Sequence, residues 1–529
     1  MVTNIKRKRV RKSVMDKAAR DLMPTRFERA RNLPACRAAR TTASGWLHSR
    51  RSLFALLVVM VIPASVTPQT AEIVIRGGVI ANADERTRAD IRIRNGTIAE
   101  IGRDLDAGPG GREIDASGLL VLPGGIDPHT HLAPNDDYHD DYESGSRAAL
   151  AGGVTTISNQ VPAQPGEALT DPLDRTEELI RAQAIADVFL HPIVLDPNAE
   201  SATGLAALVQ RGQPSVKVRL HRGAYTTDPF GYTTGLMNAA DAGVLTMMHA
   251  EDGPINHARA ERLIASGRGS IHNLIESRPD VSEEVAVQRA AAMSEATGAP
   301  VYIVHLAAGR ALRAAQEAQS RGLPVYVETR PVYLHYTADV YQQDDAELYL
   351  GVPPIRPMED QKALWEGIAD GSVHVVGTDH VPYTREHKLD PSQKVGQGNF
   401  LGGMPNLQEY RPMLYSEGVV KKRITLERFV QVTASNPAKL FGLYPRKGII
   451  AVGSDADIVL WDPNETRTIR DEDMLSGSGF SVYSGWEVTG WPVMTIRRGE
   501  VVYENGKVTG KAGSGQLIRR QKWQRPTLP

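Results

Sequence analysis

Eight short apolar runs alternate with helical stretches through the middle of the chain, and this alternation limits the fold more than any other feature. Two helical stretches, SEEVAVQRAAAMSEATG and AGRALRAAQEAQSRG, end near a glycine, a common stop signal. Repeated strand-helix units predict an α/β fold with a parallel sheet, and eight units are what a TIM-like (β/α)8 barrel needs. The runs are LLVLPGGI, GVTTISNQ, ADVFLHPIVL, SVKVRL, GVLTMMH, PVYIVHL, PVYVETR and VHVVGTD.

Two β-rich segments flank this region. The first, EIVIRGGVIANADERTRADIRIRNGTIAEIG, begins at Glu72 and carries a hairpin turn signal at Asn95-Gly96. The second contains GSDADIVLWDP and PVMTIRRGEVVYENGKV, with a similar turn at Asn505-Gly506. Their shared texture predicts one small β-sandwich domain built from both ends of the mature chain. The 529 residues have room for both domains. We expect the sandwich at 72–122 and 445–519, the barrel at 123–444 and a tail at 520–529.

The segment at 1–71 is a basic extension. Residues 1–51 contain 15 Lys and Arg against three acidic residues, a net charge of +12, so the remainder carries −13 of the chain's total of −1. An acidic body argues against nucleic acid as a partner.

The end of this extension has the order of a signal peptide. A charged stretch meets the apolar run Leu53–Ile62, which small residues follow. Ten apolar residues are too few for a permanent membrane span, which takes about 20. Arg50-Arg51 resembles a twin-arginine export signal, and an ordinary secretory signal is the alternative. We expect a periplasmic or secreted protein if residues 49–70 are a signal peptide, and a cytoplasmic one otherwise.

Candidate metal ligands stand at the carboxyl ends of five predicted strands. Cys36 is the single cysteine, which excludes a site of several cysteines. Barrels of this kind build active sites at that face, and imidazoles with a carboxylate suit a divalent metal such as zinc. Two of the histidines are one residue apart, so both imidazoles lie on the same side of their strand. The candidates are His129, His131, Lys217, His249, His305 and Asp379.

Lys217 is the unusual member of this group, since a protonated lysine would repel metal ions. Its stem could pack in the barrel while its ammonium reaches solvent. Alternatively, its amine could form a carbamate with carbon dioxide, which would be anionic and could bridge two cations. Spacing does not choose between these interpretations.

Longer motifs carry a resemblance from about Ile73 to Arg519. They include GGIDPHTHL, AALAGGVTTI, SVKV, MMHAEDG, VYIVHLAAGRAL, VPPIRPMEDQKALWEGI, VGTDHVPYTREHK, SNPAKLFGLYPRKGIIAVGSDADIVLWDP and RRGEVVYENGKVTG. In these motifs the chain resembles the amidohydrolase superfamily, closest to the hydantoinase and dihydropyrimidinase group. The resemblance implies a metal-dependent hydrolase barrel with a side β-sandwich, a binuclear zinc centre and a homotetramer.

The resemblance also implies roles for the candidate ligands. One zinc ion would be held by His129, His131 and Asp379. The other would be held by His249 and His305, and carboxylated Lys217 would bridge the two. Two zinc ions lower the pKa of a bridging water, so a hydroxide is present near neutral pH to attack an amide carbon. Asp379 would take the proton and pass it to the departing nitrogen, and a cyclic amide would open to an N-carbamoyl or related acid.

The chain departs from the hydantoinase pattern around the substrate. The tyrosine expected five residues after the bridging lysine is replaced by Arg222, and Tyr225 follows three residues later. Tyr225, Arg222 or His221 could stabilise the oxyanion. Arg330 stands where the group has a small residue, and could bind a substrate carboxylate or form a salt bridge at the barrel rim. Asn406 is displaced from the usual substrate-binding asparagine.

Several functions fit this pattern. The first hypothesis is a cyclic-amide hydrolase of hydantoinase type acting on a small molecule. Dihydroorotase-like, allantoinase-like and N-acyl amino acid or dipeptide hydrolases are nearer alternatives, although Ala133 replaces the arginine typical of dihydroorotases. A non-catalytic scaffold is a further alternative, and the six filled ligand positions argue against it. Asp127 is expected to support the strand end, and His380 and Asp252 to orient the ligands beside them.

Overall fold

The computed structural model describes residues 72–132, 138–164, 166–195, 201–396 and 400–528. Eight parallel strands lie side by side in sequence order, from β8 to β15. A parallel bridge between Thr130 and His380, just beyond β8 and β15, joins the two edges of this sheet. The predicted (β/α)8 barrel is thereby confirmed. Its strands are β8 (Gly125–Asp127), β9 (Val154–Pro162), β10 (Asp187–Ile193), β11 (Ser215–Arg219), β12 (Leu245–His249), β13 (Val301–Ile303), β14 (Val325–Thr329) and β15 (Val375–Val376).

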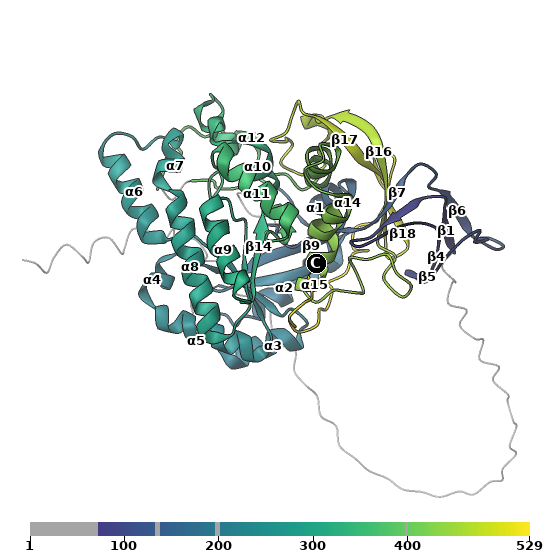
Figure 1. Cartoon of the computed structure of the whole chain (residues 1–529), viewed down its shortest axis with the longest axis horizontal. Coiled ribbons are helices and arrows are strands. Elements are labelled where there is room, and N and C mark those ends of the chain that lie inside the picture. The colour runs from purple at the N-terminus through teal and green to yellow at the C-terminus, as the bar shows by residue number, and fades with distance from the viewer. Residues whose placement is uncertain (1–71, 133–137, 165, 196–200, 397–399, 529) are drawn as a thin grey trace, which may run out of the picture. The chain divides into compact units, whose positions relative to one another are not determined.

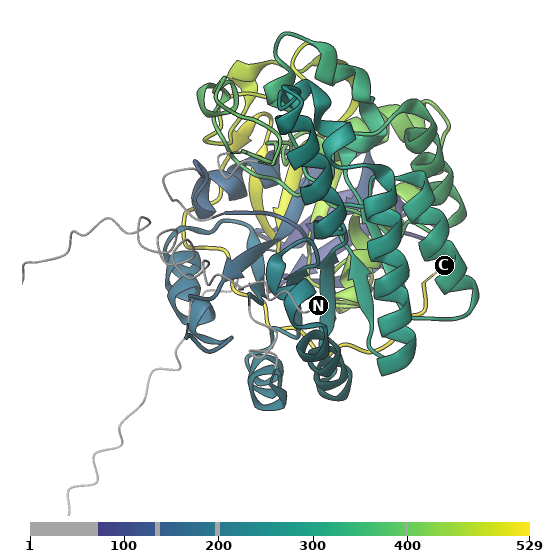
Figure 2. The ribbon, with the colours of Figure 1, turned by 90° about the vertical axis from the view of Figure 1, so that its left-hand side faces the viewer.

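Helices follow the strands and cover the barrel (Figures 1 and 2). The two expected helical stretches lie in α8 and α9, and Gly298 ends α8 in the left-handed conformation with φ of 73°. The helices are α1 (Tyr142–Ala151), α2 (Asp171–Gln183), α3 (Ala202–Gln210), α4 (Gly223–Thr227), α5 (Pro229–Ala242), α6 (Gly253–Ala265), α7 (Leu274–Ser277), α8 (Asp280–Thr297), α9 (Gly309–Ser320), α10 (Pro331–His335), α11 (Met358–Asp370), α12 (Arg385–Lys388), α13 (Tyr410–Leu414), α14 (Leu426–Val430) and α15 (Asn436–Leu440).

The first predicted strand, LLVLPGGI, is two strands in different sheets. Its first half is β7 (Leu120–Pro123), which pairs with the C-terminal strand β16 (Ile458–Thr468). Its second half begins β8, across Gly124. Both halves are apolar because both are largely buried, so the apolar run continues where the chain passes from one sheet to the other.

Both ends of the described chain build the second domain, as predicted. A seven-stranded sheet has the order β19-β18-β17-β16-β7-β2-β3, and a four-stranded sheet the order β5-β4-β1-β6 (Figure 1). Isoleucines from both sheets form a shared core, among them Ile75, Ile91 and Ile458. The domain boundaries given above stay predictions. The remaining strands are β1 (Ile73–Arg76), β2 (Val79–Ala81), β3 (Arg86–Arg88), β4 (Asp90–Arg94), β5 (Thr97–Gly102), β6 (Arg112–Asp115), β17 (Glu487–Arg497), β18 (Glu500–Glu504) and β19 (Lys507–Val508).

The two Asn-Gly signals mark hairpin turns in this domain. Asn95 and Gly96 connect β4 to β5 with φ of 51° and 80°, and Asn505 and Gly506 connect β18 to β19 with φ of 49° and 81°. Asparagine and glycine tolerate positive φ better than other residues, and these turns match the strand twist. The sequence prediction of both hairpins is confirmed.

A buried charge network ties the barrel to the C-terminal sheet. The Lys447 ammonium, 1% exposed, lies 2.8 Å from the Asp187 carboxylate on β10 and 2.6 Å from the Asp457 carboxylate. Burial alone would lower the pKa of Lys447, but these carboxylates outweigh it and raise the pKa. Lys447 therefore stays ionised inside the protein.

Replacing Lys447 with methionine is expected to lower the free energy of unfolding by about 3–5 kcal/mol, because the buried Asp457 would lose its ion pair and Asp187 would keep only that with Arg498. The neighbouring Arg446 is the matched control, since its pair with Asp455 is 46% exposed on the arginine side. Arg446→Met should cost less than about 1 kcal/mol. Denaturant unfolding of both variants checks this, and equal shifts would contradict a structural role for the buried network.

None of the helices in the described residues has the length and apolarity that a membrane crossing requires. The signal-like segment at 49–70, Cys36 and Ala133 lie outside the described residues. Export and the dihydroorotase argument from Ala133 therefore stay predictions.

Candidate metal centre

Closure of the barrel brings the first and last strand ends together. The His131 N–H donates to the His380 carbonyl at 2.9 Å. Asp127 supports this junction as expected, because its carboxylate accepts from the N–H groups of His129 and Thr378, each at 3.1 Å. The histidine pair after β8 therefore lies beside Asp379 after β15.

Two candidate ligands have backbone conformations that favour glycine. Asp379 has φ of 46° and His305 has φ of 40°. Left-handed conformations cost free energy in residues with a side chain and are often kept at functional sites. The strain is consistent with side chains that are aimed at one point.

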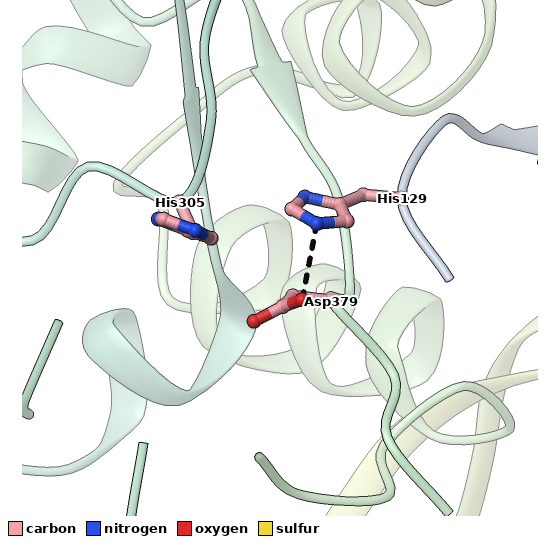
Figure 3. A group of neighbouring side chains, drawn as sticks. All are labelled: His129, His305 and Asp379. Atoms are coloured by element: carbon pink, nitrogen blue, oxygen red, sulfur yellow. Dashed lines mark ion pairs between the residues drawn. The ribbon is translucent and has the colours of Figure 1, made fainter. Parts of the chain in front are cut away.

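Asp379 is the centre of the candidate site (Figure 3). Its Oδ1 lies 3.0 Å from His129 Nε2 and 3.0 Å from His131 Nε2. His305 faces the same space from the end of β13, and ligand atoms of His129, His305 and Asp379 all lie within 4.8 Å of one another. All three residues are buried.

Lys217 and His249 complete the group from β11 and β12. The Lys217 Nζ lies 3.3 Å from His129 Nε2, and the side chain is buried, so its amine does not reach solvent. The ring of His249 lies 4.4 Å, centroid to centroid, from the ring of His305. Burial lowers the pKa of Lys217 to about 7. The structure thus brings all six predicted ligand positions together.

The imidazoles differ in their electrostatic surroundings. Burial lowers the pKa of His131 to about 4 and holds the pKa of His249 and His305 well below the usual range. Burial also acts on His129, but two nearby carboxylates outweigh it and raise its pKa. Neutral imidazoles offer a lone pair, which is the form that binds metal.

Arg330 and Asn406, two of the predicted substrate-binding residues, are fully buried. Arg330 Nη1 lies 3.2 Å from Asp379 Oδ2, and its Nε donates to the Thr378 carbonyl at 3.1 Å. Burial alone would raise the pKa of Asp379, but His129 and Arg330 hold it well below its usual range. Asn406 donates to the Thr378 carbonyl at 3.2 Å. Arg330 thus forms a buried ion pair rather than a salt bridge at the rim, and substrate binding by either residue stays a prediction.

The structure does not join Tyr225 to the metal ligands. Its hydroxyl donates to the Met293 Sδ at 3.2 Å from helix α4, and the Arg289 guanidinium stacks over its ring. Arg222 is exposed and lines a cavity of about 350 Å³ together with His221. The His221 ring lies 4.1 Å from that of His249. An oxyanion role for Tyr225 or Arg222 stays a prediction.

The sequence profile of the amidohydrolase family matches residues 120–502. This chain belongs to that family. D-hydantoinase from Rhizobium radiobacter is 36% identical over 462 residues, which cover 85% of this chain and 99% of the relative. D-phenylhydantoinase from Escherichia coli O1:K1 / APEC is 35% identical over 467 residues, which cover 86% of this chain and 100% of the relative.

Solved structures agree with these relatives. Dihydropyrimidinase from Brevibacillus agri NCHU1002 superposes with a TM-score of 0.81 at 32% identity, and covers 86% of this chain and 100% of its own. L-hydantoinase from Arthrobacter aurescens gives a TM-score of 0.78 at 29% identity, with 85% and 99% coverage. The resemblance to the hydantoinase and dihydropyrimidinase group is confirmed. This amidohydrolase is an enzyme that hydrolyses carbon-nitrogen bonds other than peptide bonds.

The donor set of this amidohydrolase fits divalent metal ions. Imidazole nitrogens and a carboxylate are common ligands of such ions. The buried Nδ1 of His305 has no hydrogen-bond partner among the described residues, and an unpaired buried polar atom is costly. A bound cation would give this group of inward-facing donors the partner that they lack.

Glu328 is a supporting residue of this amidohydrolase that sequence reasoning missed. Its carboxylate accepts from His129 Nδ1 at 2.7 Å, from the Tyr302 hydroxyl at 2.8 Å and from the His305 N–H at 3.0 Å. A proton held on His129 Nδ1 leaves Nε2 as the donor atom that faces the site. The sequence signal for this role was a carboxylate residue inside the apolar run PVYVETR, because a buried carboxylate needs partners.

Glu251 plays the corresponding part for His249. Its Oε2 lies 2.6 Å from His249 Nε2, and Arg278 Nε donates to Oε1 at 2.9 Å. Asp252, the residue expected to orient His249, instead accepts from the Ile255 N–H at 2.9 Å and caps helix α6. His380 Nε2 lies 2.8 Å from Asp140 Oδ2, which fixes its ring.

Glu251→Gln is expected to weaken the hold of His249 on metal by about 10- to 100-fold, because the neutral amide supports the imidazole less well. Metal affinity, measured by competition with a coloured chelator, checks this. Asp252→Asn is the matched control and should leave that affinity within about 3-fold of the parent. Equal losses in the two variants would argue against a specific role for Glu251.

Proposed function

We propose that this amidohydrolase opens cyclic amides with the help of two divalent metal ions, most simply zinc. The proposal rests on one observation: six ligand-type side chains from five strand ends are buried and contact one another in a chain, with the Lys217 amine 3.3 Å from His129 Nε2 and the His249 ring 4.4 Å from the His305 ring. The names of the relatives, hydantoinases and dihydropyrimidinases, give the substrate class.

In this proposal the ligands divide into two sets. One ion is held by His129, His131 and Asp379, and the other by His249 and His305. Lys217, as a carbamate formed with carbon dioxide, belongs to both. A carbamate requires a neutral amine, and burial lowers the pKa of Lys217 far enough for a substantial neutral fraction at neutral pH.

The side chains then have separate tasks. Bound divalent ions would supply an activated water at neutral pH. Asp379 accepts the proton of the attacking water and returns it to the departing ring nitrogen. Arg330 holds the Asp379 carboxylate in place through its 3.2 Å ion pair. Arg222 and His221 remain the candidate oxyanion donors, since the Tyr225 hydroxyl donates to Met293 instead.

The proposed assembly is a homo-oligomer, which the resemblance makes a tetramer. The proposed substrate is a small molecule, and no nucleic-acid partner is expected. Purified full-length protein should contain about two divalent ions per chain, and should hydrolyse at least one of hydantoin, dihydrouracil, dihydroorotate and allantoin. If the protein hydrolyses only N-acyl amino acids, the substrate class is an open-chain amide and not a cyclic one. No tightly bound metal and no turnover of any member would refute the proposal.

A further inference from the structure

Arg219 stands at the mouth of the barrel beside the metal centre. It is the last residue of β11, two residues after Lys217, and lies opposite His249 in the register of β11 and β12. Side chains of a strand alternate, so Arg219 and Lys217 point to the same side. Because Lys217 faces the interior of the barrel, Arg219 lies one step nearer the opening from which substrate enters.

Within the described part of the chain, the Arg219 guanidinium makes no hydrogen bond and no ion pair, although its side chain is partly buried. Neighbouring arginines are engaged: Arg330 with Asp379, and Arg278 with Glu251. A guanidinium has five N–H donors in a planar fork, and partly burying them without acceptors is costly.

The charge of Arg219 acts on the centre itself. The negative charge of the centre that attracts Arg219 is Asp379. The Asp379 oxygens contact His129, His131 and Arg330, and no ion pair joins them to Arg219. A positive charge that forms no ion pair with a described carboxylate therefore lies at the substrate opening.

We propose that Arg219 is a specificity-determining residue that binds a carboxylate on the ring substituent of the substrate. The substrate class is then a cyclic amide with an anionic substituent, for example a hydantoin whose 5-substituent ends in a carboxylate. A planar carboxylate matches the guanidinium fork with two parallel hydrogen bonds. This inference rests on the proposed ring-opening function.

The test compares two nearly isosteric substrates, 5-(2-carboxyethyl)hydantoin and its carboxamide. The wild-type protein should favour the carboxylate by about 10- to 100-fold in kcat/KM, the range of a hydrogen-bonded charge pair. In Arg219→Met, which keeps the apolar stem, the two values should lie within about 3-fold. Arg219→Lys should restore part of the preference, since it restores the charge without the fork.

Two controls separate the possible failures. Arg313→Met removes the same charge from the exposed face of helix α9 and should keep the wild-type preference. Metal content should be unchanged in Arg219→Met. If neither substituted hydantoin is opened while hydantoin, dihydrouracil, dihydroorotate or allantoin is, this inference is overturned and the proposed function stands; if none of these compounds is opened, the proposed function fails. If both are opened equally well by the wild type, or if Arg219→Met lowers both by the same factor, Arg219 does not read the substituent and this inference is overturned.

Discussion

Lys217→Ala is expected to lose most of its bound metal and to lower kcat/KM by on the order of 10³-fold or more, because the activated water depends on the ions. The variant removes the anion that both ions would share, and leaves four imidazoles and one carboxylate around two cations. Metal analysis and steady-state kinetics on the same preparation measure the two effects. Retention of two ions per chain with wild-type turnover would contradict a bridging role.

Lys217→Arg is the matched control, since a guanidinium keeps the positive charge but forms no carbamate. Added propionate should restore part of the activity of Lys217→Ala, where a cavity remains, and none of the activity of Lys217→Arg. In the metal-free parent, loading with metal and bicarbonate should increase as the pH rises through about 7, because burial lowers the pKa of Lys217 to that value and the neutral amine is the reactive form. Loading that is independent of both pH and bicarbonate would exclude the carbamate.

The barrel could be predicted because the alternation of apolar runs and helices is a local property of the chain. The hairpins were predictable for the same reason, since Asn95-Gly96 and Asn505-Gly506 each favour positive φ within one turn. The division of LLVLPGGI between β7 and β8 was not predictable. This division depends on the pairing of β7 with β16, which lies more than 330 residues further along the chain. The composition of an apolar run does not indicate which strand it pairs with.

The convergence of the six candidate ligands could be predicted because strand ends of a barrel meet at one face. The roles of Glu328 and Glu251 could not be predicted, since a buried carboxylate acquires its role from the side chains that packing brings to it. Tyr225 shows the limit of spacing arguments. Helix α4 turns its hydroxyl toward Met293 on helix α8, and a count of residues from Lys217 contains no information on that direction.

Asp379→Asn is expected to lower kcat by about 10²- to 10⁴-fold, the range for loss of a general acid-base group. Asparagine is a near isostere and adopts left-handed backbone readily, so φ of 46° at this position can be kept. The amide cannot take up a proton from water, and it also weakens one metal set. Kinetics at fixed excess metal separate the two losses, because only weakened binding is recovered by added ions.

Arg330 supplies the control for this variant. Asp379→Asn leaves the fully buried Arg330 guanidinium without its anion, so the midpoint of thermal unfolding should fall. Combining Asp379→Asn with Arg330→Met removes the unpaired charge, so the double variant should recover stability but not turnover. Arg330→Met alone keeps the carboxylate and removes the group that positions it, so its kcat should fall less than that of Asp379→Asn. A single Arg330 variant as inactive as Asp379→Asn, with metal content unchanged, would contradict a merely supporting role for Arg330.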